Sequence, residues 1–110
     1  RVYAAEPAWA DDAARSLESG RIEQPTRYDT VADGLRTPLG EHTFPIIKAL
    51  LDGIILVTEE AIADAATRFH RGAHMRVEPS ALVTLAAIAA EPAPFRDRPT
   101  ALVFTGGNVG

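Results

Sequence analysis

The sequence predicts an α/β fold, a parallel sheet with helices on both faces, and three observations lead to this prediction. Short apolar segments typical of strands alternate with helical segments of about a dozen residues, the pattern of a helix-covered parallel sheet. One apolar run, IILV at 54–57, is uninterrupted, as in a parallel strand that is buried on both faces. With 110 residues, of which 46% are hydrophobic, the chain forms one domain at most.

The chain begins with a predicted strand and a predicted helix. RVYAAE at 1–6 is typical of a short buried strand, and Pro7 ends it because proline cannot donate to a sheet ladder. A helix is expected over 10–20, with two acidic residues at its positive N-terminal end and Gly20 as its C-cap. Its predicted apolar stripe consists of Ala13, Ala14 and Leu17.

A loop and a second helix follow. Residues 21–35 contain proline and many polar residues without a helical period, which predicts an extended loop with a tight turn at the ADG sequence, 32–34. From about 42 to 51, apolar residues recur at helical spacing, and Pro45 fits the first turn, where its missing N–H costs little. The stripe of this helix is Phe44, Ile47, Leu50 and Leu51.

The second half of the chain alternates strands with helices. Helices are expected from Glu59, with Thr58 as N-cap, and from Pro79, where proline is favoured as the first helical residue. A proline-rich loop at 91–99 separates the last helix from the last strand. The strands predicted here are 54–57, 75–78 and 100–104.

Composition excludes several classes of function. The formal net charge is -4 and no basic stripe is present, which argues against a nucleic-acid surface. No apolar run approaches the roughly 18 residues that a membrane span needs. The absence of cysteine excludes a disulfide framework and a thiolate site, and it is compatible with a reducing cytoplasm, where we place the protein. The chain opens into a strand at Arg1 without methionine, so we expect it to be a segment of a longer protein.

Polar turns follow three of the predicted strands. In parallel α/β sheets, ligands bind just beyond the carboxyl ends of the strands. This rule selects residues 6–12, 78–80 and 105–108 as candidate site segments.

Five motifs resemble one enzyme family. They are VYAAEPAWADDAARSL, TVADGL, GEHTFPII, VEPS and TGGNV, and their order and separations cover nearly the whole chain. Together they are similar to the serine racemase and serine/threonine dehydratase branch of the fold-type II (tryptophan synthase β-like) enzymes, which depend on pyridoxal 5'-phosphate. The resemblance implies that residues 1–110 are the C-terminal part of the large cofactor-binding domain, and that the complete protein is a homodimer.

The resemblance also implies that part of the active site is contributed by another segment. The family's Schiff-base lysine, its phosphate loop and its small domain correspond to sequence upstream of Arg1. The only lysine here is Lys48, which matches an ordinary surface residue of the family. We therefore expect no catalytic residue in this chain, and no activity without the missing N-terminal segment.

The cofactor contacts implied by the resemblance are Thr105, Gly106 and Gly34. Thr105 matches the serine or threonine whose hydroxyl bonds the pyridine nitrogen, and a hydroxyl does not force that nitrogen to be protonated. Gly106, with Gly107, allows backbone to approach a flat ring. The alternative for 105–108 is a plain turn after a strand, and for Asp33 and Gly34 a solvent-facing turn.

Glu6, Ala10 and Asp12 match the divalent-metal site of the racemase-like members. Two carboxylates and the Ala10 carbonyl would bind Mg²⁺, or Mn²⁺ or Ca²⁺, with waters completing the shell, as suits a hard cation. The alternative is that these acids favour a helix N-terminus.

Three further positions match family sites. Asn108 corresponds to a nucleotide contact of the ATP-activated racemases, but the companion basic residue is His74 here, and an amide that closes its own turn is the alternative. Glu78 faces the cofactor region in relatives, although it could simply begin a helix. His42 matches a residue near a second ion in some relatives, with a surface histidine as the alternative.

The resemblance implies a hydroxyamino-acid dehydratase or racemase. Its substrate would be L-serine, L-threonine or 3-hydroxyaspartate, and its products a 2-oxo acid and ammonia, or the opposite enantiomer. The sequence leaves the two reactions open, and dehydratase is the prediction that we adopt. The alternative from a different class is a free-standing, non-catalytic α/β module that binds nucleotide or metal.

Overall fold

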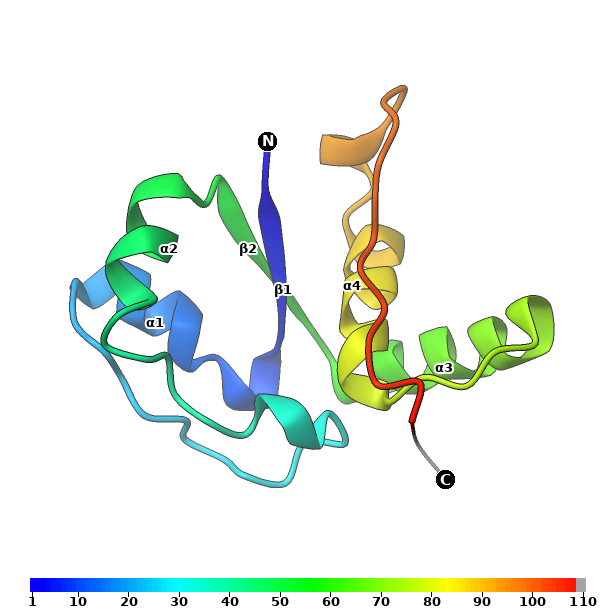
Figure 1. Ribbon diagram of the computed structural model, residues 1–110, viewed down its shortest axis with the longest axis horizontal. Coiled ribbons are helices and arrows are strands. Elements are labelled where there is room, and N and C mark those ends of the chain that lie inside the picture. Colours follow the sequence, from blue (N-terminus) through cyan, green and yellow to red (C-terminus); the bar gives the residue numbers. More distant parts are fainter. Residues whose placement is uncertain (109–110) are drawn as a thin grey trace.

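The computed structural model describes residues 1–108, and it has two parallel strands with helices on both sides (Figure 1). The strands are β1 (Tyr3–Pro7) and β2 (Gly53–Val57). The helices are α1 (Asp12–Ser19), α2 (Phe44–Leu50), α3 (Glu59–Ala73) and α4 (Pro79–Ala90). Short 3-10 turns are η1 (Ala8–Ala10), η2 (Asp33–Leu35) and η3 (Ala93–Phe95). The strands separate α1 and α2 from α3 and α4, as the predicted fold class requires.

The core lies where α4 covers the sheet and α3 packs on α4. The strands pair in parallel from Tyr3 opposite Gly53 to Pro7 opposite Val57. Val57 of β2, Ile62 of α3 and Val83 of α4 are almost fully buried in one apolar cluster. Each such side chain stabilises the fold by about 1.5–3 kcal/mol relative to an exposed one.

The helix ends predicted from local signals in the sequence are confirmed. The Thr58 hydroxyl accepts a hydrogen bond from the Ala61 N–H at 3.1 Å, which confirms the predicted N-cap of α3. Gly20 ends α1 in the left-handed conformation, with φ 79°, as expected of a C-cap glycine. Pro79 is the first residue of α4, and Pro45 lies in the first turn of α2.

Two predicted strands are absent from the described residues. Segments 75–78 and 100–104 are irregular, because neither has a neighbouring strand with which to pair. Val77 is buried against α4, but Val103 leaves 73% of its surface exposed. The prediction recognised their apolar character but could not show whether a partner was present.

The buried faces also differ from those expected. β2 is not buried on both faces, since Leu56 is 41% exposed between buried Ile55 and Val57. The residues that α1 buries are Asp12 and Ser16, while its predicted alanine and leucine stripe is only partly covered. In α2, Phe44 is buried whereas Leu50 is exposed. The described part of the chain therefore leaves apolar surface uncovered.

The loop between α1 and η2 is held by polar contacts. The Arg15 guanidinium donates to the Gln24 carbonyl at 2.6 Å, and the Ser16 hydroxyl accepts from the Glu23 N–H at 2.8 Å. Further along the loop, the Arg27 guanidinium stacks 3.3 Å from the centre of the Trp9 ring. These contacts fix a segment whose sequence predicted only a loop.

Within residues 1–108, no helix combines the length and apolarity that crossing a membrane demands.

Candidate functional site

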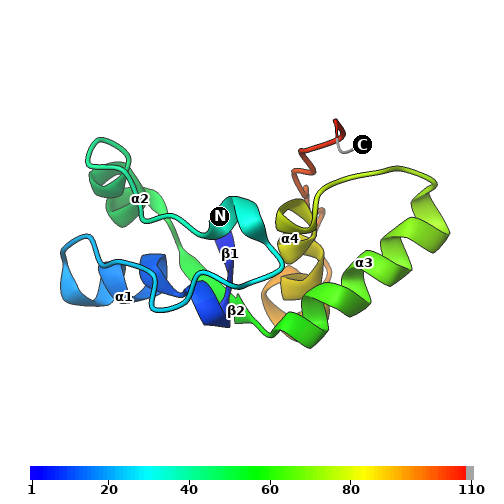
Figure 2. The ribbon, with the colours of Figure 1, turned by 90° about the horizontal axis from the view of Figure 1, so that it is seen from below.

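The candidate site segments gather at one edge of the molecule. The carboxyl ends of both strands, η2, the N-terminus of α4 and residues 105–108 all lie toward the lower side of Figure 1. Figure 2, viewed from that side, shows η2 next to the N-terminal end of α4. The segments chosen from the sequence by the strand-end rule are therefore on the same side of the fold.

Glu78 and Gly106 are in close contact at this edge. Gly106 has φ 73°, a left-handed conformation that residues with a Cβ rarely adopt. A Cβ added there would also overlap the Glu78 carboxyl group, with Oε1 at 2.8 Å. The backbone angle thus favours glycine at 106, and the contact with the Glu78 side chain brings the 105–108 turn onto the start of α4.

The turn around Gly106 presents polar groups to solvent. Thr105 is exposed, so its hydroxyl is accessible at the carboxyl end of the sheet region. A Cβ at Gly107 would be 3.7 Å from the Arg76 carbonyl oxygen, an ordinary contact, so this glycine is less constrained than Gly106. Asn108, the last described residue, is also exposed.

The ADG turn is attached to the same helix end. The Gly34 N–H donates to the Ser80 hydroxyl at 3.0 Å, and a Cβ at Gly34 would lie 2.9 Å from that oxygen. The predicted tight turn is thus confirmed as η2, beginning at Asp33. The sequence placed Ser80 in the candidate segment 78–80 and singled out Gly34, but it did not predict the hydrogen bond between them.

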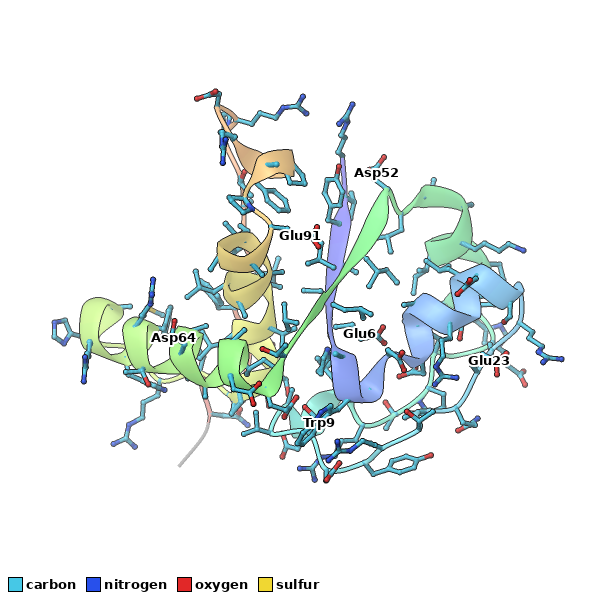
Figure 3. The ribbon with its side chains drawn as sticks, turned by 180° about the vertical axis from the view of Figure 1, so that it is seen from behind. Glu6, Trp9, Glu23, Asp52, Asp64 and Glu91 are labelled. Carbon is cyan, nitrogen blue, oxygen red and sulfur yellow. The ribbon has the colours of Figure 1, made fainter. Side chains whose placement is uncertain are left out.

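Glu6, Ala10 and Asp12 form a buried cluster between β1 and α1. Their exposed fractions are 7%, 0% and 2%. The two Glu6 oxygens accept hydrogen bonds from the N–H groups of Ala13, at 2.9 Å, and Ala14, at 3.1 Å. Figure 3 shows Glu6 where β1 gives way to the turn before α1. Glu6 therefore caps α1 from a distance, which the sequence did not reveal.

The cluster has excess negative charge for its degree of burial. Desolvation raises the pKa of Glu6 to about 7, and the neighbouring charge of Asp12 adds to this despite the two backbone hydrogen bonds. Burial likewise raises the pKa of Asp12. Two adjacent carboxyl groups with raised pKa values favour a bound proton or a bound cation.

The other predicted positions are exposed. His42 lies in the turn before α2, and His74 ends α3 in the left-handed conformation with φ 54°. Lys48 is exposed and lies beside Gly20. A Cβ added at Gly20 would be 3.6 Å from the lysine Nζ. This places the lysine at the C-terminus of α1, where a cation is favourable.

Comparisons with known proteins identify the family. The model of the family "Pyridoxal-phosphate dependent enzyme" matches residues 1–106. Serine racemase from Dictyostelium discoideum is 44% identical over 115 residues, and β-hydroxyaspartate dehydratase from Paracoccus denitrificans is 38% identical over 109; each match covers 99% of this chain and 35% of the relative. The crystal structure of a T.th. threonine deaminase superposes with TM-score 0.88 at 42% identity, covering 99% of this chain and 39% of that one.

The chain thus spans about a third of the length of the curated relatives that it matches. The match with the family nevertheless runs through every element described above, from β1 to the turn at Gly106. The chain belongs to the family of pyridoxal-phosphate dependent enzymes.

Proposed function

We propose that this chain forms the C-terminal part of the large domain of a pyridoxal-phosphate dependent hydroxyamino-acid dehydratase. The observation that carries the proposal is the left-handed turn at Gly106, which packs on Glu78 and leaves the Thr105 hydroxyl exposed beside it. Family membership favours this function over a free-standing nucleotide- or metal-binding module. The active protein, with the segment that carries the Schiff-base lysine, is called the complete enzyme below.

The residues present fit the cofactor. A flat heteroaromatic ring needs backbone that can approach its plane, and glycine at 106 and 34 leaves that backbone without a side chain. Both glycines pack on the start of α4, Gly106 on Glu78 and Gly34 on Ser80. A pyridine nitrogen needs one polar partner, and the accessible hydroxyl of Thr105 can donate to it. Most members of the family have serine at this position, and threonine keeps the hydroxyl.

Each of these residues has a defined part in the proposal. Bound pyridoxal phosphate would supply an electron-withdrawing ring that stabilises the charge left at the substrate α-carbon when its proton is removed. The Thr105 hydroxyl orients the ring through its nitrogen without imposing a positive charge there. Asp33 and Gly34 present the η2 backbone to the ring, and Glu78 supports the turn at Gly106.

The substrate is proposed to be L-serine, L-threonine or 3-hydroxyaspartate. Loss of the α-proton and of the β-hydroxyl as water, followed by hydrolysis, gives a 2-oxo acid and ammonia. Return of the proton to the opposite face would instead give the enantiomer. The names of the relatives cover a racemase, a dehydratase and a deaminase, and dehydratase is preferred because elimination is shared by two of the three.

A divalent cation is proposed for the cluster of Glu6, Ala10 and Asp12. The set comprises two buried carboxylates and one carbonyl, and Mg²⁺ retains several waters, so few protein ligands are needed. Residues 1–108 contain no group of three or more His, Cys, Asp and Glu side chains placed to hold a metal. The raised pKa of Glu6 supports the assignment, because a cation would supply the missing positive charge.

The rest of the complete enzyme is proposed to add a strand beside β1. A groove of about 520 Å³ lies between the N-terminal half of β1, α4 and residues 98–103. One edge of β1 is paired with β2, and the groove lies along residues 1–5, beside the extended segment 100–103. A strand from the lysine-bearing segment would pair with both sides and convert the predicted strand at 100–104 into a true one.

The test is to produce the complete enzyme and compare Thr105→Ala with Thr105→Ser. The wild type should bind pyridoxal phosphate with a visible absorbance band and form pyruvate from L-serine or 2-oxobutyrate from L-threonine. Removing one preorganised hydrogen bond should reduce kcat by about 100-fold in Thr105→Ala, whereas Thr105→Ser should stay within a few-fold. Equal rates for both variants would remove the role of the hydroxyl, and a colourless wild type would overturn the proposed function.

A further inference from the structure

The loop before η2 is held to the start of α3 by one buried threonine. Thr30 is fully buried, and its hydroxyl lies 2.9 Å from Oε1 and 2.8 Å from Oε2 of Glu59. Glu59 Oε1 also accepts the Val31 N–H at 2.7 Å. The same threonine hydroxyl accepts the Ala32 N–H at 3.3 Å. The first residue of α3 is thus connected through Thr30 to the residue that directly precedes η2.

Arg36 binds the backbone carbonyl of Thr30. Its Nε and terminal nitrogen donate to the Thr30 carbonyl oxygen at 3.0 Å and 2.7 Å. Thr30 therefore lies between a carboxylate and a guanidinium, each of which makes charge-assisted hydrogen bonds to it. These contacts fix both the entry to η2 and the residue that follows η2.

The middle of η2 is fixed independently by α4. Gly34 donates its N–H to Ser80, and the absence of a Cβ at Gly34 permits this approach. η2 is consequently held from two different helices, at its start by Glu59 through Thr30 and at its centre by Ser80. Surface loops are usually more mobile than the elements they connect, and residues that bind ligands are often on loops that a rigid scaffold positions.

We propose that Glu59, acting through Thr30, is a positioning residue that sets the Asp33–Gly34 turn against the cofactor ring, with Ser80 as the second point of attachment. The inference rests on the proposed function, because it assumes that η2 contacts pyridoxal phosphate. It assigns a role to two helix N-termini whose acidic and hydroxyl residues would otherwise be explained by capping alone. A small displacement of a group that touches the reacting molecule can cost about 100-fold in rate.

The experiment compares Glu59→Gln with Glu60→Gln in the complete enzyme. Both changes remove one negative charge from the first turn of α3, and with it a favourable interaction with the helix dipole. Glu60 is exposed, whereas Glu59 contacts Thr30 and Val31. A second pair, Thr30→Val and Thr30→Ser, removes or keeps the buried hydroxyl. Readouts are the cofactor dissociation constant of the reconstituted apoenzyme, the position of its visible absorbance band, kcat and KM.

We expect Glu59→Gln and Thr30→Val to weaken cofactor binding and lower kcat by about 10- to 100-fold, with a shifted absorbance band. Glu60→Gln and Thr30→Ser should remain within about twofold, because neither removes a group that attaches η2. If Glu59→Gln does not fold, Ser80→Ala tests the second attachment by the same readouts. A lowered unfolding midpoint with unchanged cofactor affinity and band would overturn the positioning role. A wild type without cofactor would instead overturn the proposed function.

Discussion

The helices α1 and α3 both carry carboxylates near their N-termini, but these carboxylates have different partners. Each follows a parallel strand; the carboxylates at α1 are buried, whereas Glu59 at α3 is half-buried and contacts the buried Thr30. Near α3, the Glu59 carboxylate accepts hydrogen bonds from the Thr30 hydroxyl and the Val31 N–H. The Arg36 guanidinium donates to the Thr30 carbonyl oxygen. Near α1, Glu6 and Asp12 lie together and burial raises both of their pKa values. The Glu59 carboxylate thus has protein donors, whereas burial of Glu6 and Asp12 disfavours their charged forms.

The largest expected effect is the pH dependence that arises from Glu6. Because folding raises its pKa from 4.5 to about 7, the folded protein binds more protons than the unfolded one between these values. This contribution is fully present below pH 4.5 and lost as pH rises through 7, at most about 3 kcal/mol of unfolding free energy.

Denaturant unfolding of the complete enzyme in EDTA, from pH 5 to 8, measures this effect. Glu6→Gln should remove the decline in unfolding free energy across that range. Glu18→Gln, which changes an exposed carboxylate of α1, should leave the decline in place. Parallel curves for wild type and Glu6→Gln would contradict the raised pKa.

The second prediction concerns the cluster of Thr30 and Glu59 at α3. Thr30→Val should lower the unfolding free energy by about 2 kcal/mol, because the Ala32 N–H and one side of the Glu59 carboxylate lose their partner. Thr30→Ser should recover most of this loss. Chemical denaturation of the three proteins checks it, and equal stability of Thr30→Val and wild type would show that water replaces the hydroxyl.

Magnesium binding should stabilise the protein through the cluster at α1 but not through the cluster at α3. At ten times its dissociation constant, Mg²⁺ should stabilise the complete enzyme by about 1.4 kcal/mol through the α1 cluster. Asp12→Asn should abolish this shift, while Glu60→Gln, at the start of α3, should retain it. Thermal unfolding with and without Mg²⁺ measures this stabilisation. If Asp12→Asn is still stabilised by Mg²⁺, the ion binds at a site other than the α1 cluster.

The smallest effects are expected at the opposite ends of the two helices. Both end in a left-handed residue, Gly20 after α1 and His74 after α3. Gly20→Ala should cost about 1 kcal/mol, since a Cβ is disfavoured in this conformation, and His74→Gly should stabilise by about 0.5 kcal/mol. Unfolding midpoints measure both, and a destabilised His74→Gly would indicate that the imidazole makes a favourable contact.

Local signals in the sequence were sufficient for features decided within a few residues. Thr58, Gly20 and Pro79 predicted three helix ends correctly, since capping depends on adjacent backbone groups. The predicted segments at 75–78 and 100–104 were not strands, because pairing depends on a distant partner that no local pattern contains.

The same distinction applies to the site. Gly34 and Gly106 were singled out by the resemblance to the family, and glycine in a polar turn is compatible with close approach of the backbone. Ser80 lies in the segment 78–80 that the strand-end rule selected, but its bond to Gly34 and the bond of Glu59 to Val31 could not be predicted, since these partners are 46 and 28 residues apart in the sequence. The site contacts predicted for Thr105 and for the cluster at Glu6 stay predictions that the experiments above address.

The groove beside β1 has a practical consequence for producing this segment alone. The edge of β1 that faces the groove has no paired strand among residues 1–108, and the neighbouring extended segment includes the exposed Val103. Such an edge is a template to which strands of other polypeptides can add. Expression of residues 1–110 without the companion segment should therefore yield aggregates rich in intermolecular sheet, and co-expression with the lysine-bearing piece should suppress them.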